Sequence, residues 1–572
     1  MSENTQRYLV TSALPYANGP LHVGQISGAY LPADIFVRYL RMRGEDVVYV
    51  CGTDDHGVPI TLTAEREGKS PKEVVDHWWG HMKETFDRFN ISFDNFSHTS
   101  TEIHAENTRH FYEKLKAGGY ISEAESKQMY SATEGRFLPD RYVEGTCPVC
   151  GYKEARGDQC DNCGSWYEAY ELIEPHSKIT GGPVEVRETT HLYFDLPKFS
   201  ERLKEYISGQ GHWRTSVKNF ILGFINAGLE RRPITRDISW GVPVPEPGFE
   251  DKRFYVWFDA HIGYISSTME WAERIGEPDK WREYWQEPDT KMIHFIGKDN
   301  TVFHTTMWPA QLMGVAEGGE EPYALPYDVP ANEFMNLEVP FEGERRAMQM
   351  STSRNLAVWL HEALDKFPAD PLRFYLASTL PETADVNFSW RDFQSRVNSD
   401  LIGNLGNYVN RVLSFTGKYF DGELKKPGGF SEEALSALSD FKEIEARYEA
   451  KMLDERPREA LSELLAMGRR ANQFFDASAP WKTRKEDMEL TGATLYVCSA
   501  MLGSIAYHAS PYVPEAMGRL QTFFDGPMER VSDLELPALY RTSGAKPLFV
   551  RIEDDDVEAA DEKLAGAVRG ES

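Results

Sequence analysis

Four cysteines of the chain occur as two closely spaced pairs. Cys147 and Cys150 are separated by two residues, as are Cys160 and Cys163, and nine residues lie between the pairs. Two such pairs in a chain without secretory features are typical of a tetrahedral zinc site with four thiolate ligands. Disulfides are the alternative, which a reducing compartment disfavours. Because no catalytic histidine lies nearby in the sequence, we expect a structural zinc in a compact knuckle.

A second group of residues is suited to binding a nucleotide. The sequence His22-Val23-Gly24-Gln25 stands where a loop gives way to a helix. The first turn of a helix offers unpaired N–H groups to phosphate, and a glycine there lets a nucleotide approach the backbone. The imidazole of His22 can donate to a phosphate oxygen. The segment therefore predicts a nucleotide site that differs from the three-glycine dinucleotide fingerprint and from the lysine-bearing phosphate loop.

The elements around this loop form a βαβ unit. Residues 7–11 are β-branched and aromatic and predict a buried strand, residues 26–43 predict a helix that ends at Gly44, and residues 46–51 predict a second buried strand. A ligand of such a unit lies at the carboxyl ends of its strands. Later in the chain, residues 254–260 and 292–297 are also strand-like. Polar residues that follow these strands are therefore expected to face the same site.

Length and charge limit the possible functions. The chain has 572 residues, of which 41% are hydrophobic, which predicts three or four well-packed domains. No apolar run reaches about 18 residues and the N-terminus is polar, so we expect no membrane span, no signal peptide and a cytoplasmic protein. The net charge of −28 argues against a nucleic-acid partner unless a basic groove lies on an otherwise acidic body.

Several longer strings resemble the class I aminoacyl-tRNA synthetases, in the form found in the methionyl-tRNA synthetase family. They are Ala-Leu-Pro-Tyr-Ala-Asn-Gly followed by His-x-Gly at 13–24, Tyr-Val-Trp-Phe-Asp-Ala-His-Ile-Gly-Tyr at 255–264, and Phe-Ile-Gly-Lys-Asp-Asn-Thr-Val-Phe-His at 295–304. The first signature of the family usually ends in His or Asn, so Gln25 is a departure. An amide can still hydrogen-bond phosphate or ribose, although it carries no charge.

The resemblance implies an α/β fold with a split Rossmann-like catalytic domain, an inserted zinc-knuckle connective domain and an α-helical anticodon-binding bundle. The implied segments are 1–117 and 232–327 for the two catalytic halves, 118–231 for the connective insertion, 328–395 for a stem-contact region with the second signature loop, 396–552 for the bundle and 553–572 for an acidic, solvated tail. The small insertion argues against the leucine, isoleucine and valine enzymes, which carry a large editing domain there.

The resemblance also implies the activity and its residues. We expect a methionine–tRNA ligase that forms methionyl-adenylate from methionine and magnesium ATP, then transfers methionine to the terminal ribose of its tRNA. The implied methionine-binding residues are Leu14, Tyr16, Asp54, Trp257, Ala260, Tyr264 and His304. Aromatic rings suit a polarizable thioether, and a carboxylate must meet the ammonium group. Spacing alone leaves Asp55 as a close rival of Asp54.

The ATP site is implied in the same way. Its residues are His22, Gly24, Gln25, Gly297, Asp299, Met350, Ser351, Thr352 and Ser353. The second signature loop of the family carries two lysines, and Gln349 and Thr352 replace them here. Those lysines neutralise the triphosphate, so Arg354, Arg345 or Arg346 would have to supply the charge. We expect His22, Gln25 and Arg354 to be catalytic.

The chain after Pro371 is helical almost throughout, and the resemblance assigns its bundle to the methionine anticodon. The matching residues are Asn407, Arg411 and Trp481, a set of amide, guanidinium and ring groups that suits unstacked RNA bases. The expected partners are initiator and elongator methionine tRNA, ATP and methionine, and the expected state is a monomer. A class I synthetase for another amino acid and a non-catalytic tRNA-binding relative are the alternatives, the latter suggested by Gln25, Gln349 and Thr352.

Overall fold

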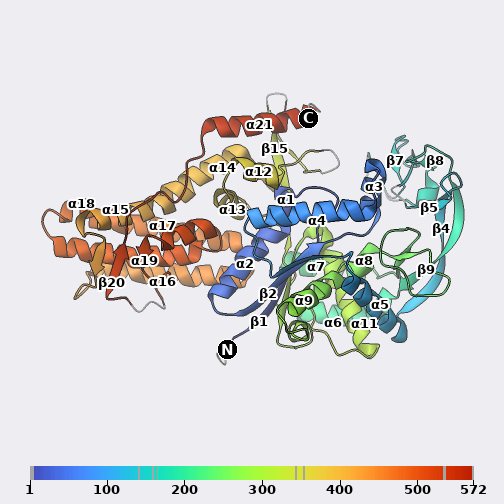
Figure 1. The fold of residues 1–572 in the computed structure, drawn as a ribbon, viewed down its shortest axis with the longest axis horizontal. Helices are drawn as coiled ribbons and strands as arrows, with labels where there is room; N and C mark the ends of the chain where they lie inside the picture. The colour runs from blue at the N-terminus through green and yellow to red at the C-terminus, as the bar shows by residue number, and fades with distance from the viewer. Residues whose placement is uncertain are drawn as a thin grey trace.

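The structure is a computed structural model of the full chain. It describes every residue except 1–4, 140–141, 158–159, 161, 164, 166, 342–343, 352–354, 533–535 and 570–572. The molecule is elongated, with a helical bundle at one end of its long axis and the β4–β9 sheet at the other (Figure 1). Strands β1 (Arg7–Ser12) and β2 (Asp46–Thr53) lie between these two ends.

A five-stranded parallel sheet organises the catalytic domain. Its strands are β1 (Arg7–Ser12), β2 (Asp46–Thr53), β3 (Asn95–His98), β13 (Lys291–Gly297) and β14 (Ala331–Asn332), in the order β14-β13-β1-β2-β3. The chain moves from β1 to β2 on one side and returns to β13 on the other side of β1. The carboxyl ends of β1 and β13 therefore flank a topological switch point, where α/β sheets bind their ligands.

Both faces of this sheet are buried, and apolar side chains of its strands point to both of them. Tyr8 and Val10 of β1 pack into one hydrophobic cluster, with helix α2 (Leu31–Met42) and helix α4 (Pro71–Arg88). Leu9 points into the opposite cluster. That cluster also contains residues of α5 (Glu102–Ala117), α9 (Ile262–Arg274) and α11 (Trp308–Glu317). The predicted first and second strands, the helix between them and the strand at 292–297 are confirmed, although that helix begins with a π-helical turn, η1 (Ile26–Tyr30).

The inserted segment between the two halves of the sheet has its own β-structure. An antiparallel sheet has the order β10-β9-β4-β5, with long strands β4 (Ile121–Ser131) and β9 (Glu185–Phe194) and short strands β5 (Arg136–Leu138) and β10 (Arg232–Pro233). The cysteine pairs lie at a smaller sheet of β6 (Val143–Thr146), β7 (Ala155–Arg156) and β8 (Ile173–Ser177). Helices α6 (Ser200–Gly209) and α7 (Thr215–Asn226) lead back to the catalytic half.

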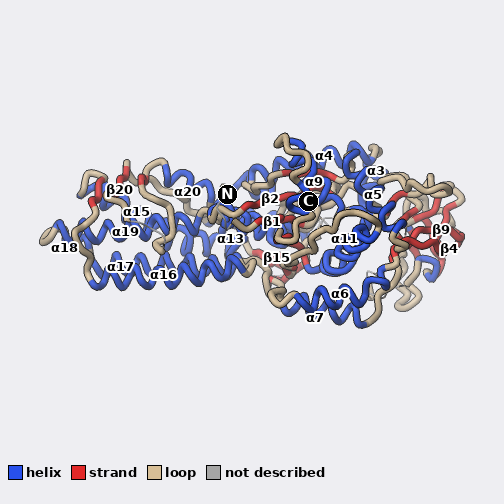
Figure 2. The backbone as a smooth tube through the Cα atoms, turned by 90° about the horizontal axis from the view of Figure 1, so that it is seen from below, coloured by secondary structure: helices blue, strands red, loops and turns tan. Residues whose placement is uncertain are grey.

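The bundle contains η7 (Val397–Gly406), α15 (Asn407–Tyr419), α16 (Glu432–Leu453), α17 (Pro457–Ser478), α18 (Pro480–Thr483), α19 (Met488–Ala509) and α20 (Pro514–Gln521). The tube view separates it clearly from the catalytic part (Figure 2). Helix α19 is long and apolar enough to cross a membrane by length and composition, but 78% of its most apolar window is buried inside the structure. Its burial is that of a central bundle helix.

Two local predictions were wrong. Residues 254–260 do not form a strand, because β12 ends at Phe254 and α8 (Val256–Asp259) begins directly after it. A short apolar run cannot be assigned to strand or helix by its pattern alone. The acidic tail is not solvated either. It forms helix α21 (Asp554–Arg569), which packs on β15 (Met335–Phe341) and α14 (Trp390–Arg396) through the buried side chains of Val557, Ala560 and Leu564.

Candidate functional site

A cavity of about 370 Å³ opens at the carboxyl ends of the central strands. Its walls come from the loops that follow β1, β2, β13 and β14, together with α8 and the start of α9. The lining residues are Ala13, Leu14, Pro15, Tyr16, His22, Gly24, Gln25, Gly28, Ala29, Tyr30, Asp54, Trp257, Ala260, His261, Tyr264, Gly297, Asp299, Asn300, His304, Glu333, Phe334, Met335, Gln349 and Met350. The pocket therefore lies at the switch point of the sheet.

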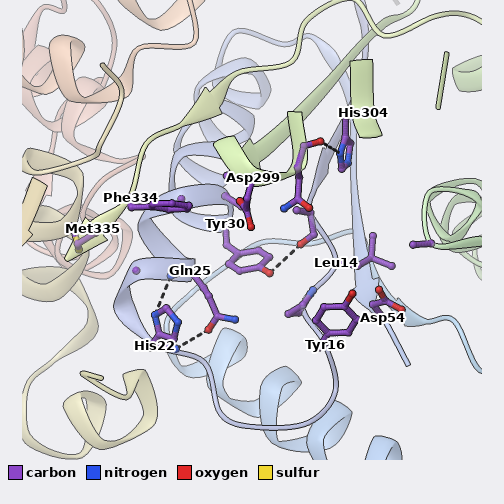
Figure 3. A pocket seen from close by; sticks show the side chains of 18 of the residues that line it. Leu14, Tyr16, His22, Gln25, Tyr30, Asp54, Asp299, His304, Phe334 and Met335 are labelled. Carbon is purple, nitrogen blue, oxygen red and sulfur yellow. Dashed lines mark hydrogen bonds between the residues drawn. The ribbon is translucent and has the colours of Figure 1, made fainter. Parts of the chain in front are cut away.

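Most of the residues predicted from the sequence meet in this one cavity. All seven candidate methionine-binding residues line it, and six candidate nucleotide-binding residues do, namely His22, Gly24, Gln25, Gly297, Asp299 and Met350. Ser351 is not among the lining residues. Thr352, Ser353 and Arg354 lie outside the described residues. Figure 3 shows His22 and Gln25 at one end of the pocket and His304 at the other.

His22 and Gln25 form a reciprocal cap at the start of α1 (Val23–Gln25). The N–H of Gln25 donates to His22 Nδ1 (3.3 Å), and the N–H of His22 donates to Gln25 Oε1 (3.0 Å). Burial lowers the pKa of His22 to about 4. The imidazole is therefore neutral in the free protein, with its proton on Nε2, because Nδ1 accepts. Nε2–H of His22 and the amide NH₂ of Gln25 remain as donors for a ligand.

The absence of a side chain avoids close contacts at two glycines beside the nucleotide end. A Cβ added to Gly24 would lie 3.0 Å from His22 Nδ1 and 3.3 Å from the Met335 carbonyl oxygen. A Cβ at Gly297 would lie 2.7 Å from Asp299 Oδ1. Burial raises the pKa of Asp299 above its ordinary value. A side chain at either glycine would displace the groups that face the cavity.

Side-chain contacts distinguish the two adjacent aspartates that follow β2, Asp54 and Asp55. Asp55 Oδ1 accepts from Thr53 Oγ1 (2.6 Å), and its Oδ2 accepts from Ser100 Oγ (2.6 Å) and contacts His98 Nδ1 (2.9 Å). Burial alone would raise the pKa of Asp55, but His98, with Ser100 and Thr53, lowers it. Asp55 is thus fully engaged within the protein, and it does not line the cavity.

Asp54 faces the cavity instead. Among the residues that the structure describes, its side chain accepts one weak hydrogen bond, from the N–H of His56 (3.4 Å). Burial raises the pKa of Asp54 well above that of a free aspartate, and the nearby charges of Asp259 and Asp55 raise it further. A buried carboxyl group in this state lacks a cation. An ammonium group of a ligand would supply that missing charge.

A buried histidine–aspartate–histidine chain supports the wall behind Asp54. His56 Nδ1 lies 2.6 Å from Asp259 Oδ2, and His104 Nε2 lies 3.5 Å from the same oxygen. Burial alone would raise the pKa of Asp259, but His56 and His104 lower it. Burial alone would lower the pKa of His56, but Asp259 raises it. The cluster has metal-ligating atoms, yet the 2.6 Å contact is a charge-assisted hydrogen bond, which keeps Asp259 ionised.

The far end of the cavity is aromatic and contains one internal hydrogen bond. Tyr264 Oη and His304 Nε2 are 2.9 Å apart, and His304 Nδ1–H donates to the carbonyl of Asn300 (3.1 Å). Burial lowers the pKa of His304 to about 4, so its Nε2 accepts from Tyr264. Trp257 stacks on Phe303 with ring centroids 3.8 Å apart. These rings form a largely apolar pocket in which Tyr264 and His304 are bonded to each other.

The segment that follows the second signature loop joins the first signature through backbone contacts. The N–H of Val23 donates to the Val358 carbonyl (3.0 Å), and the N–H of Leu360 donates to the Leu21 carbonyl (2.9 Å). The predicted charge at Arg345 is engaged elsewhere, since β16 (Glu344–Met348) presents it to Asp561 of α21. Arg345 is therefore not a free cation for the triphosphate.

The four predicted zinc ligands converge. Their sulfur atoms lie within 4.8 Å of one another, with Cys147 Sγ 3.9 Å from Cys163 Sγ and Cys150 Sγ 3.6 Å from Cys160 Sγ. Thiolates about 2.3 Å from a tetrahedral zinc are separated by about 3.8 Å. The cluster therefore fits zinc.

The three predicted anticodon residues come from two helices of the bundle, α15 for Asn407 and Arg411 and α18 for Trp481. Asn407 and Arg411 share a face of α15, and the guanidinium of Arg411 lies 5.9 Å from the Trp481 ring centroid. Trp481 is exposed by 37%. Arg411 also pairs with Asp476 and lies over Phe475 (4.2 Å), which fixes its orientation.

Sequence reasoning missed several residues that line the cavity. Phe334 and Met335 follow β14, a two-residue strand too short to leave a pattern. Asn300 and His261 lie inside strings that the resemblance had identified, so their positions were available from the sequence. Lys298 lies beside the cavity but pairs with Glu333 (2.7 Å) and Asp385 (2.8 Å).

Comparison with known proteins first identifies the class of protein to which the chain belongs. A family model described as tRNA synthetases class I (M) matches residues 8–413, and one described as the anticodon binding domain of methionyl tRNA ligase matches residues 426–569. A structure of Mycobacterium tuberculosis methionyl-tRNA synthetase in complex with methionyl-adenylate is similar with a TM-score of 0.77 at 25% identity, covering 96% of this chain and 100% of that one. The fold is that of a class I aminoacyl-tRNA synthetase.

Curated relatives narrow the class to one family. The methionine–tRNA ligase of Rubrobacter xylanophilus is 80% identical over 570 residues, covering 100% of this chain and 99% of the relative. That of Pyrococcus furiosus is 45% identical, covering 96% of this chain and 76% of the relative. The chain belongs to the methionyl-tRNA synthetase family.

Proposed function

We propose which residues of this chain bind methionine, ATP and tRNA in the reaction of this family. The chain is a methionine–tRNA ligase that activates methionine with ATP and charges tRNA. The convergence of His22, Asp54 and His304 in a single cavity at the switch point supports the proposal most directly. Positioning and electrostatics carry such a reaction, and no protein nucleophile is needed.

Asp54 binds the ammonium group of methionine. Its buried carboxyl lacks a cation in the free protein, whereas Asp55 is held by Thr53, His98 and Ser100. Leu14 and Tyr16 line the same side, and Trp257, Ala260, Tyr264 and His304 enclose the thioether. A flexible, polarizable side chain packs well against such rings. This placement leaves the carboxylate of methionine directed toward the nucleotide end.

The nucleotide end binds ATP. Nε2–H of His22 and the amide of Gln25 donate to phosphate oxygens, while Gly24 and Gly297 allow close approach. The N–H groups of Val23 and Gln25 are bonded to the Val358 carbonyl and to His22, so they take no part. Asp299 accepts from ribose hydroxyl groups. The carboxylate of methionine attacks the α-phosphorus, pyrophosphate leaves, and a terminal ribose hydroxyl of tRNA then displaces AMP. Magnesium accompanies ATP and neutralises its phosphates, and Arg354 with Met350, Ser351, Thr352 and Ser353 completes the site.

The remaining assignments concern metal, tRNA and assembly. Cys147, Cys150, Cys160 and Cys163 hold one structural zinc, which the 3.6–3.9 Å sulfur separations support. Asn407, Arg411 and Trp481 contact the anticodon of both initiator and elongator methionine tRNA. The protein acts as a cytoplasmic monomer.

Methionine-dependent ATP–pyrophosphate exchange by the purified chain tests the proposal. We expect exchange with methionine and much weaker exchange with leucine. Charging of methionine tRNA in the same preparation tests the second step. Exchange that responds to leucine as strongly as to methionine would contradict the assigned pocket.

A further inference from the structure

His261 is a buried histidine without a hydrogen bond. It stands immediately before α9, lines the cavity and is 1% exposed. Within the described part of the chain, neither Nδ1 nor Nε2 has a partner. Buried polar groups in native proteins are almost always hydrogen-bonded, so each exception requires an explanation.

Other buried histidines of this protein do not share this state. His56 pairs with Asp259, His191 with Thr235 and His294 with Thr11. Among the described residues, His261 alone has both ring nitrogens buried and unpartnered. An ordinary core histidine therefore does not account for it, and a group that is absent from the free protein is needed.

The rings around His261 locate this group at the thioether end of the pocket. The ring centroid of His261 lies 4.4 Å from that of His304, and it stacks on Trp308 at 5.7 Å. The ring centroid of Trp257 lies 6.2 Å from that of His261. Burial lowers the pKa of His261 well below 6.5, and the nearby His304 and His294 lower it further. The ring is thus neutral and has one N–H donor and one acceptor.

Two neighbouring polar side chains that line the cavity, Tyr264 and His304, already have partners within the protein. Tyr264 Oη donates to His304 Nε2 (2.9 Å), and His304 Nδ1–H donates to the Asn300 carbonyl (3.1 Å). Trp308 Nε1 and His294 Nε2 are also without a partner among the described residues, but neither residue lines the cavity, whereas His261 does. A ligand that enters this end of the cavity therefore meets the unpartnered ring of His261.

We propose that His261 is a specificity-determining residue whose imidazole N–H donates a hydrogen bond to the thioether sulfur of bound methionine. The inference rests on the proposed methionine site. Sulfur is a weak acceptor, whereas the methylene that replaces it in norleucine accepts nothing. A site with a buried donor discriminates against an analogue that leaves the donor unpaired. An aromatic pocket alone distinguishes the two side chains poorly, because their shapes are nearly the same.

The test compares methionine with norleucine in ATP–pyrophosphate exchange for wild type, His261→Phe and His261→Gln. Loss of the donor in His261→Phe should lower the ratio of kcat/KM for methionine over norleucine by about three- to tenfold. His261→Gln, which keeps a donor, should recover part of the ratio. The KM for ATP and the melting temperature show whether each variant is intact, and His261→Ala replaces His261→Phe if the latter does not fold.

The outcomes separate this inference from the proposed function. A purely structural role would lower both kcat/KM values equally and leave the ratio unchanged, which would overturn the inference. A wild-type protein without methionine-dependent exchange would instead overturn the proposed function. A ratio that falls in His261→Phe, with an unchanged KM for ATP, supports the inference.

Discussion

Tyr16 and Asp54 are paired through their backbones, although they follow different strands. The N–H of Asp54 donates to the Pro15 carbonyl (2.8 Å), and the N–H of Ala17 donates to the Asp54 carbonyl (3.1 Å). This parallel bridge extends the β1–β2 pairing beyond the strands themselves. The ring of Tyr16 and the carboxyl group of Asp54 consequently lie side by side at the cavity (Figure 3).

The two adjacent aspartates are expected to respond differently to the same substitution. Asp54→Asn removes the partner of a buried ammonium group, which costs about 2–5 kcal/mol of binding. The kcat/KM for methionine should therefore fall at least about 30-fold, since about 1.4 kcal/mol is tenfold, while the KM for ATP and the melting temperature change little. Exchange kinetics measure the first effect and thermal unfolding the second.

Asp55→Asn is the matched control for this experiment. It disrupts the contacts to Thr53, His98 and Ser100, so we expect the free energy of unfolding to fall by about 1–3 kcal/mol. If Asp55→Asn abolished methionine use in a protein of unchanged stability, the assignment of the ammonium partner would be reversed.

The raised pKa of Asp54 predicts a pH dependence. A raised pKa keeps the carboxyl group protonated in the free protein up to a higher pH than usual, and only the carboxylate binds ammonium well. The kcat/KM for methionine should therefore rise with pH through this pKa and level off above it. The profile is measured by exchange kinetics below the pH at which methionine itself loses its ammonium proton. An Asp54→Asn profile that kept the same inflection would assign it to another group.

Because the second signature lacks its two lysines, an arginine has to supply the positive charge for the triphosphate. Substitutions of Arg345 and Arg354 test which arginine does so. Arg345 pairs with Glu338 and with the buried Asp561, so its guanidinium is already engaged within the protein. Arg345→Ala should leave pyrophosphate exchange nearly unchanged. Arg354→Ala should slow adenylate formation about 100-fold, as expected for the loss of a group that stabilises developing charge. Exchange rates at saturating methionine and ATP measure both. Equal effects of the two substitutions would show that the charge has a different source.

The cysteine cluster predicts one zinc ion per chain. Cys150→Ser removes a thiolate and should reduce the zinc content to near zero, because three remaining ligands bind the ion far more weakly. Metal analysis of the purified protein is the measurement. Cys498, which is buried in the bundle, supplies the control, and Cys498→Ser should keep its zinc. Zinc retained in Cys150→Ser would contradict the four-thiolate site.

Local patterns in the sequence determined much of this protein. The βαβ unit, the spacing of the cysteine pairs and the long bundle helices follow from residue types at short range, since strand and helix periods are local properties. The strings around His22, Trp257 and His304 pointed to residues that do meet in one cavity. The sequence therefore determined which elements form and which residues could carry the chemistry.

Tertiary structure decided what each group faces. Nothing local separates Asp54 from Asp55, but the bridge to Tyr16 turns one toward the cavity and the contact with His98 holds the other in the protein. The packing of α21 on β15 and α14 likewise depends on contacts between segments far apart in the chain. The same holds for the burial of the His261 ring, whose two nitrogens have no hydrogen-bond partner among the described residues. A side chain's direction follows from its backbone conformation, and its partners come from packing, so neither could be read from the neighbouring residues alone.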